Sequence, residues 1–221
     1  MLKKLLALLG KTPTTAGDTY APSAPYRQDE LNLIYNLLFC DNAALFKRQQ
    51  ESASLFGELA EPDVVRTIAD DSDEESRVRI LACNWLRDNG HPVPARELMG
   101  VIVEVPLDDG LDVLAAYADG TVRYINQTGK FAVFESSPPD IVMRAQALVE
   151  ISRPALRHSA AAQERRPPPP AIGNIRLTYL ASDGLHVSQG TFEAMAKNAR
   201  ASAVIQSAQD LLDLVVKQAS E

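Results

Sequence analysis

The fold is decided by Leu98–Glu135, which has the sequence LMGVIVEVPLDDGLDVLAAYADGTVRYINQTGKFAVFE. Apolar residues alternate with other residues around Val101–Val105 and again around Leu111–Tyr117, and this period of two predicts β-strands. Asp119-Gly120 predicts a hairpin turn, because glycine adopts positive φ without a steric cost. A second turn at residues 127–129 separates two further short strands. The stretch therefore predicts a four-strand antiparallel meander.

Helical periodicity precedes this meander. Four helices are predicted, beginning at or near Asp29, Asp41, Pro62 and Ser72. In the fourth, Ser72 and Glu75 match a capping box, in which each side chain accepts a hydrogen bond from a free backbone amide. Trp85 shares the apolar stripe of this helix, so we expect it to be largely buried. These helices predict an N-terminal helical half.

The remaining chain predicts a helix over residues 138–149, a two-strand hairpin over 175–189 and a final helix around 204–215. The two late helices most simply cover one face of a single antiparallel sheet that contains both strand blocks. The predicted class is α+β: an N-terminal helical half, then a four-strand meander, a helix, a two-strand hairpin and a helix.

Composition shifts predict the domain boundaries. A short amphipathic segment and linker occupy residues 1–25, a helical subdomain residues 26–97, and an α+β sheet domain residues 98–221. A Pro-rich loop is expected at 152–171, because Pro167–Pro170 favours extended, exposed chain. With Arg165-Arg166 in front of it, this run has a second interpretation, as a polyproline ligand for an aromatic groove.

Charge and cysteine content limit the kinds of function and the cellular setting that we expect for the protein. The net charge is −7, and only residues 151–173 are clearly basic, so we expect no nucleic-acid binding, which needs a broad basic face. Cys40 and Cys83 fit helix cores and form no disulfide framework, which favours a reducing compartment. We expect a cytoplasmic, bacterial protein. Nothing is long enough to span a bilayer. Met1–Gly10 is expected to dock on protein, with weak peripheral membrane contact as the alternative.

Catalytic, cofactor-binding and metal-binding motifs require particular residues at fixed spacings, and this sequence does not match them. The acidic run Asp70–Glu75 lacks the glycine and the final glutamate of a calcium loop and is explained by a helix start. No histidine has a second ligand at zinc spacing. His186 with Asp183 is a conceivable general base, but a solvent-facing strand histidine is the simpler interpretation. We therefore assign no catalytic, cofactor or metal residue.

The sequence thus favours a non-enzymatic protein-interaction or regulatory module whose partner is another protein. The alternative is an enzyme or a small-ligand sensor with a pocket between the helical half and the sheet. Polar contributions to such a surface would come from Arg123, Tyr124, Asn126 and Lys130. A deep pocket with converging polar groups would favour the alternative, and a flat apolar patch would favour the interaction module.

Overall fold

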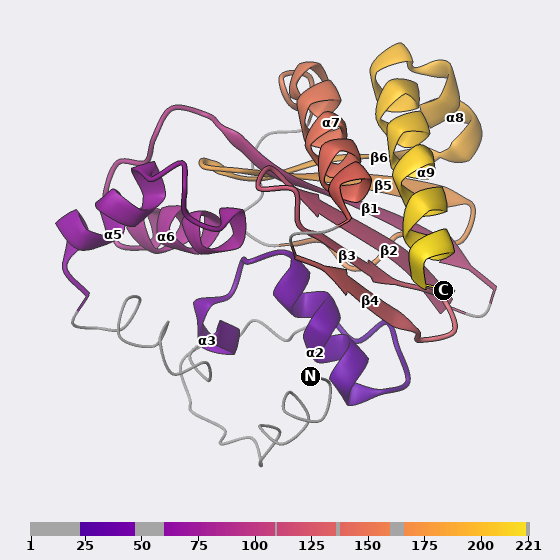
Figure 1. Cartoon of the computed structure of the whole chain (residues 1–221), viewed down its shortest axis with the longest axis horizontal. Helices are drawn as coiled ribbons and strands as arrows, with labels where there is room; N and C mark the ends of the chain where they lie inside the picture. Colours follow the sequence, from indigo (N-terminus) through magenta and orange to yellow (C-terminus); the bar gives the residue numbers. More distant parts are fainter. Residues whose placement is uncertain (1–22, 47–59, 109, 136–137, 160–165, 220–221) are drawn as a thin grey trace.

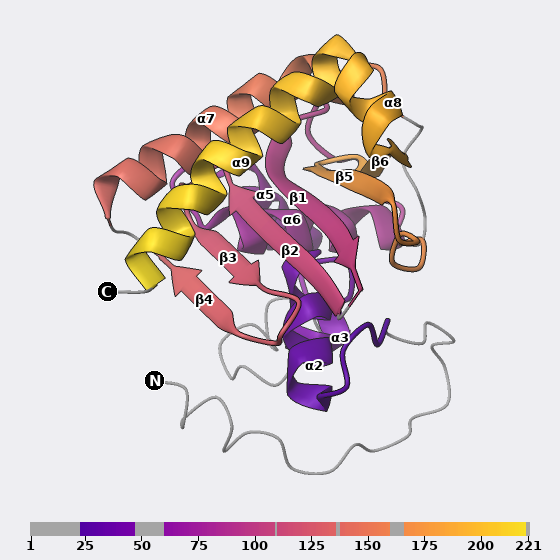
Figure 2. The same ribbon diagram turned by 90° about the vertical axis from the view of Figure 1, so that its right-hand side faces the viewer.

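The computed structural model describes residues 23–46, 60–108, 110–135, 138–159 and 166–219. One antiparallel sheet of six described strands runs through the molecule, with helices on both faces (Figures 1 and 2). Its strands are β1 (Leu98–Leu107), β2 (Gly110–Tyr117), β3 (Val122–Ile125), β4 (Phe131–Phe134), β5 (Asn174–Ala181) and β6 (Gly184–Thr191). Their spatial order is β4-β3-β2-β1-β5-β6. The α+β class, the meander and the shared sheet are confirmed, whereas Met1–Gly10 lies outside the described residues.

Strand β1 lies between the meander and the later hairpin. Its Val103 is opposite Leu114 of β2 on one side and Leu177 of β5 on the other. The pairing with β5 shifts register between Leu98 and Gly100, which marks a β-bulge. Alternation alone predicts Met99 on the same face as Val101, and this is wrong, because the bulge moves Met99 to the opposite core cluster.

One face of the sheet is covered by α7 (Pro139–Leu156), α8 (Phe192–Lys197) and α9 (Ala199–Ala219) (Figure 2). The core beneath them is mainly aliphatic and includes Leu148, Leu177 and Leu211. The short α8 was not predicted; Thr191 caps it by accepting a hydrogen bond from the Ala194 amide at 3.2 Å. Helix α7 reaches Leu156, so the predicted loop starts later than residue 152.

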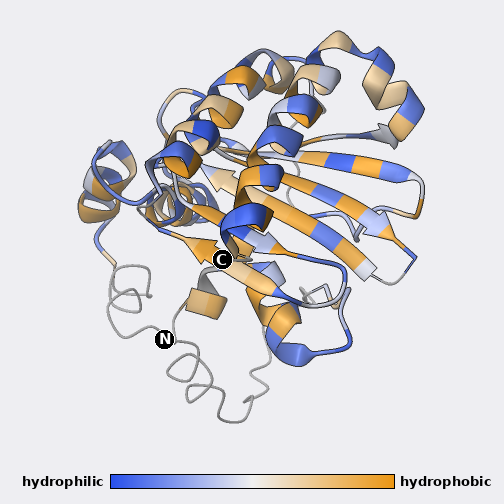
Figure 3. Ribbon diagram, turned by 45° about the vertical axis from the view of Figure 1, so that its right-hand side comes forward, coloured by the Kyte–Doolittle hydropathy of each residue, from blue (hydrophilic) through white to orange (hydrophobic). Residues whose placement is uncertain are grey.

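The other face is covered by α2 (Asp29–Leu38), α3 (Ala43–Phe46) and α6 (Ser76–Asp88), and α5 (Pro62–Asp70) packs against α6 (Figure 1). These helices are shorter than α7 and α9. Trp85 of α6 is partly buried and packs against the core cluster of this layer, and its ring stacks on that of His91, with the ring centroids 6.0 Å apart. Figure 3 shows long hydrophobic stretches in the central strands and hydrophilic residues on the outer helices. None of the described helices combines the length and hydropathy needed to cross a membrane.

Candidate functional site

A ladder of polar side chains crosses three strands on the face that α2 covers. Glu104 on β1 is directly opposite Arg176 on β5, and Arg176 is directly opposite Gln189 on β6. The Arg176 guanidinium lies 3.5 Å from the Glu104 carboxylate and donates from Nε to the Gln189 side chain at 2.8 Å. Tyr35 of α2 donates its hydroxyl hydrogen to Glu104 at 2.7 Å. Glu104 and Arg176 are 0% and 2% exposed, so the pair is buried in the fold.

An extended segment, Arg166–Pro170, lies against this ladder; we call it the proline strap. Proline lacks an N–H and fixes φ, so four consecutive prolines favour a polyproline II conformation with carbonyls free to accept hydrogen bonds. Arg176 donates to the Pro167 carbonyl at 3.1 Å and also to the Pro168 carbonyl. Arg166 and Pro170 are buried, and only Pro168 of the four prolines is classed as exposed. The expectation of an exposed proline run is therefore wrong.

Arg166 anchors the strap in an aromatic and acidic pocket. Its guanidinium carbon lies 3.9 Å from the Phe39 ring centroid and 5.1 Å from that of Tyr35, within the range of cation–π attraction. Its Nε lies 3.6 Å from the Asp41 carboxylate, and its Nη2 donates to the Asn36 side chain. The Arg166 side chain is 1% exposed. Arginine suits the pocket because its planar cation stacks on rings and pairs with carboxylates at the same time.

The electrostatics of this cluster depend on mutual neutralisation. Burial raises the pKa of Glu104, while Arg176, Tyr35 and Arg166 oppose the rise. Burial likewise raises the pKa of Asp41, and Arg166 opposes it. Two carboxylates thus balance two guanidinium groups in a space closed to solvent. Glu104 is fully buried and pairs with Arg176, which donates to the strap carbonyls. The arrangement is therefore suited to holding the strap.

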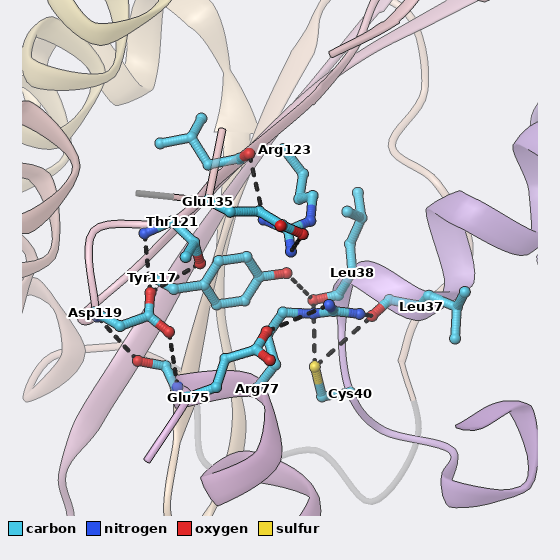
Figure 4. A network of polar contacts seen from close by, with 12 residues as sticks. Leu37, Leu38, Cys40, Glu75, Arg77, Tyr117, Asp119, Thr121, Arg123 and Glu135 are labelled. Atoms are coloured by element: carbon cyan, nitrogen blue, oxygen red, sulfur yellow. Dashed lines mark hydrogen bonds and ion pairs between the residues drawn. The ribbon is translucent and has the colours of Figure 1, made fainter. Parts of the chain in front are cut away.

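The C-terminus of α2 forms a second polar cluster (Figure 4). Helix ends leave backbone carbonyls without intrahelical partners. Tyr117 of β2 donates to the Leu38 carbonyl at 2.6 Å, and Arg77 of α6 donates to the Leu37 carbonyl at 3.4 Å. Cys40, with a φ of 52°, turns the chain away just beyond the helix and is fully buried. These contacts attach α2 to the sheet and to α6.

The start of α6 is capped by a residue distant in sequence. The predicted capping box is wrong, because the helix begins at Ser76 and Glu75 makes no side-chain cap. Instead the Ser76 amide donates to the Asp119 carboxylate at 2.8 Å, and the Asp119 amide donates to the Ser76 hydroxyl at 3.0 Å. Asp119 also accepts two hydrogen bonds from Thr121. The β2–β3 turn therefore caps the helix (Figure 4).

His186 is buried rather than solvent-facing, with an exposed fraction of 1%. Its Nε2 lies 2.9 Å from Asp183, and Arg96 donates to the other oxygen of that carboxylate at 2.7 Å. Burial alone would raise the pKa of Asp183, but the hydrogen bonds from His186 and Arg96 outweigh it and lower that pKa. A general base needs access to substrate, so this buried histidine is better explained as a structural partner of the β5–β6 turn.

The acidic run Asp70–Glu75 has local roles. Asp71 accepts a hydrogen bond from the Asp73 amide at 3.0 Å, and Glu74 accepts one from the Glu75 amide at 2.9 Å. Across the described ranges no group of three or more His, Cys, Asp or Glu residues is placed to hold a metal ion.

The outer face of α7 carries exposed apolar side chains at helical spacing. Met143 and Ile151 are 65% and 43% exposed, and Ala147 and Pro154 are also exposed. We call these four residues the α7 stripe; the 3.6-residue period places them on one side of the helix. Beside it is an open hollow of about 370 Å³, lined by Ala118, Gln146, Ala147, Val149, Glu150 and Arg153. The hollow is open and shares Ala147 with the stripe, so the two form one continuous surface.

The four polar residues predicted to form a surface do not converge. Arg123 is 7% exposed and pairs with Glu135 at 3.6 Å, on the face that α2 covers. Tyr124 follows it on the strand and packs against the opposite core cluster. Asn126 organises its turn by accepting hydrogen bonds from the amides of residues 128 and 130, and Lys130 is exposed. Their use as a common site therefore stays a prediction without geometric support.

Sequence reasoning missed the strap cluster because its members are far apart in the chain. One signal was present: Glu104 interrupts the run Val101–Val105, and a charge in a buried strand needs a partner. Arg176 occupies the same kind of position in its own strand. Nothing local to Arg166 or Asp41 identifies them as an ion pair.

Comparisons of the chain with family models, with curated proteins and with solved structures found no match. A functional proposal therefore depends on the geometry described above.

Proposed function

We propose that the protein is a non-enzymatic interaction module that binds another protein through the α7 stripe. The observation that carries this proposal is the exposure of Met143 and Ile151, at 65% and 43%, on one helix face. Exposed apolar residues on a soluble protein are usually scattered, whereas a contiguous patch is typical of an interaction site. A helix with such a stripe can pack against an apolar groove or helix of a partner.

The residues around the stripe support the same proposal. Glu150 and Arg153 form an ion pair at 2.5 Å on the side of the hollow, and Gln146 lies beside them. Protein interfaces commonly combine an apolar centre with a polar rim that remains in contact with water. The stripe and the hollow together match that arrangement on a rigid helix.

The alternative of a pocket between the helical half and the sheet has less support. The described side chains in that space pack into one core cluster, which includes Leu81, Ile102 and Tyr117. The charged groups there include the ion pairs Glu104–Arg176 and Asp41–Arg166, which lie within the fold. The hollow that the structure does show is open and lies on the other layer, next to α7. Ligand sites instead enclose most of a bound molecule.

The test compares wild-type protein with Met143→Glu/Ile151→Glu. A charge on each side chain makes burial in an interface unfavourable, while both positions are exposed in the fold. A partner captured from cells that produce the protein should be purified and titrated against each variant. We expect the dissociation constant to rise at least about tenfold, which corresponds to about 1.4 kcal/mol.

Val64→Glu is the matched control. Val64 is 51% exposed and lies on α5, on the opposite layer, so this substitution should leave binding unchanged. Circular dichroism establishes that all variants are folded. The proposal is wrong if no partner is captured by the wild-type protein, or if the partner binds the double variant and the wild type equally.

A further inference from the structure

We propose that the groove beneath the proline strap is a docking site for arginine–proline-rich segments of other proteins, and that the strap occupies this site in cis. The groove is separate from the α7 stripe, since it lies on the face of the sheet that α2 covers. A partner segment would compete with the strap for the same contacts.

The groove recognises the backbone of the strap. A polyproline II segment has no internal hydrogen bonds, so its carbonyls are available to a protein donor. One guanidinium, that of Arg176, donates to two consecutive strap carbonyls, Pro167 and Pro168. Gln189 and Glu104 hold this guanidinium in place from the neighbouring strands. The donor is therefore preorganised for an extended proline-rich chain.

The pocket beside the groove recognises one side chain, that of Arg166. Phe39 and Tyr35 present their ring faces to the Arg166 guanidinium, and Asp41 supplies the negative charge. In the described part of the chain the Asp41 carboxylate oxygens have no hydrogen-bond partner, so Arg166 is the cation that offsets this charge. Aromatic faces with a carboxylate discriminate arginine from lysine and from neutral residues. The pocket thus selects an arginine immediately before the prolines.

The strap and a partner segment would compete for the same groove. The strap is joined to β5 through only residues 171–173, so it stays close to the groove. Such a short connection gives a high effective concentration, on the order of millimolar. A free segment must overcome this advantage, which makes the site autoinhibited in the resting protein. Weakening the strap anchor should therefore uncover binding.

The test uses a fluorescent peptide with the sequence of residues 166–172, Arg-Pro-Pro-Pro-Pro-Ala-Ile. Fluorescence anisotropy should show that Arg166→Ala protein binds it at least about tenfold more tightly than wild type, because the variant strap no longer fills the arginine pocket. A peptide with alanine in place of its arginine should not bind. Adding Asp41→Asn should weaken binding of the arginine peptide at least about tenfold, because the pocket loses its charge.

Arg200→Ala is the matched control, because Arg200 is an exposed arginine on α9 and should leave weak, wild-type-like binding. Arg166→Lys provides a second variant that retains the charge but loses the stacking plane, and intermediate peptide binding is expected. If Arg166→Ala does not fold, refolding with the peptide should restore soluble protein. Folded Arg166→Ala without arginine-dependent binding, or unfolded Arg166→Ala without rescue, overturns the proposal.

Discussion

The two faces of the sheet are covered in different ways. The long helices α7 and α9 cover one face, and the core beneath them is largely aliphatic (Figure 2). Short helices, turns and the proline strap cover the other face (Figure 1). Charged and hydroxyl groups lie beneath them, including Glu104, Arg176 and Tyr35.

This difference follows from backbone hydrogen bonding. A long helix satisfies its own amides and carbonyls except at the ends, so few side-chain partners are needed. Short helices and extended segments present many free backbone groups for their length. On that face side chains supply the partners: Tyr117 and Arg77 at the end of α2, and Arg176 along the strap. A sheet face that is covered by short helices and extended chain thus needs polar side chains in the core beneath them.

Arg176→Met should produce the largest loss of stability. It leaves the buried Glu104 without its cation, so we expect a cost of about 3–5 kcal/mol in the free energy of unfolding, to be measured by urea denaturation. Glu104→Met/Arg176→Met removes both charges and should recover most of the loss. A double variant as unstable as the single one would show that packing, not charge pairing, dominates this face.

Leu211→Ala tests the aliphatic face. Leu211 is fully buried on α9, and its truncation should cost about 3 kcal/mol through lost burial and a residual cavity. Because no charge is involved, the cost should be the same at pH 5 and pH 8. A loss that changes between these two pH values would indicate that ionisation also contributes beneath α9.

The buried carboxylate of Glu104 and the partly exposed carboxylate of Asp183 should make contributions to stability that change with pH in opposite directions. The pKa of Asp183 is lowered in the fold, so its stabilisation is present above its ordinary value of 3.8 and is lost as the pH falls. The pKa of Glu104 is raised, so its contribution is full below its ordinary value of 4.5 and declines as the pH rises. Relative to Asp183→Asn, wild type should lose stability on acidification. Relative to Glu104→Gln, it should lose stability towards neutral pH.

The smallest expected effect concerns thiol reactivity. Burial raises the pKa of Cys40 to about 12 and that of Cys83 to about 11. Because the thiolate is the reactive form, neither should be alkylated by iodoacetamide at pH 8 in the folded protein. Both should be modified after unfolding in urea. Mass spectrometry that finds a modified native Cys40 would show that the α2 end opens in solution.

The aliphatic face could be predicted from the sequence to a greater extent than the polar face. The strands of Leu98–Glu135 follow from period-two alternation and their turns, and the helix predicted over residues 138–149 lies within α7, whose first turn contains Pro139. These signals are local, because each depends on residues a few positions apart. Helix α9 is predicted for the same reason.

The polar contacts could not be predicted because they join distant segments. Asp119 caps α6 across the β2–β3 turn, where Ser72 offered a plausible local cap. The bulge near Gly100 changes the face of Met99 without a distinctive residue pattern. The proline strap has a strong local conformation, but its partner Asp41 belongs to the helical half. Local sequence fixes conformation here, and tertiary packing decides what each segment contacts.

The central position of β1 also constrains the order in which the protein can assemble during translation. The ribosome releases β1 well before β5, since β2, β3, β4 and α7 are synthesised between them. Until β5 emerges, the nascent chain can form the meander but leaves one edge of β1 unpaired and Glu104 without Arg176. An ionised carboxylate on that edge opposes pairing with a foreign strand. Glu104, which needs Arg176 as its partner in the folded core, would thus protect the partly synthesised chain from aggregation.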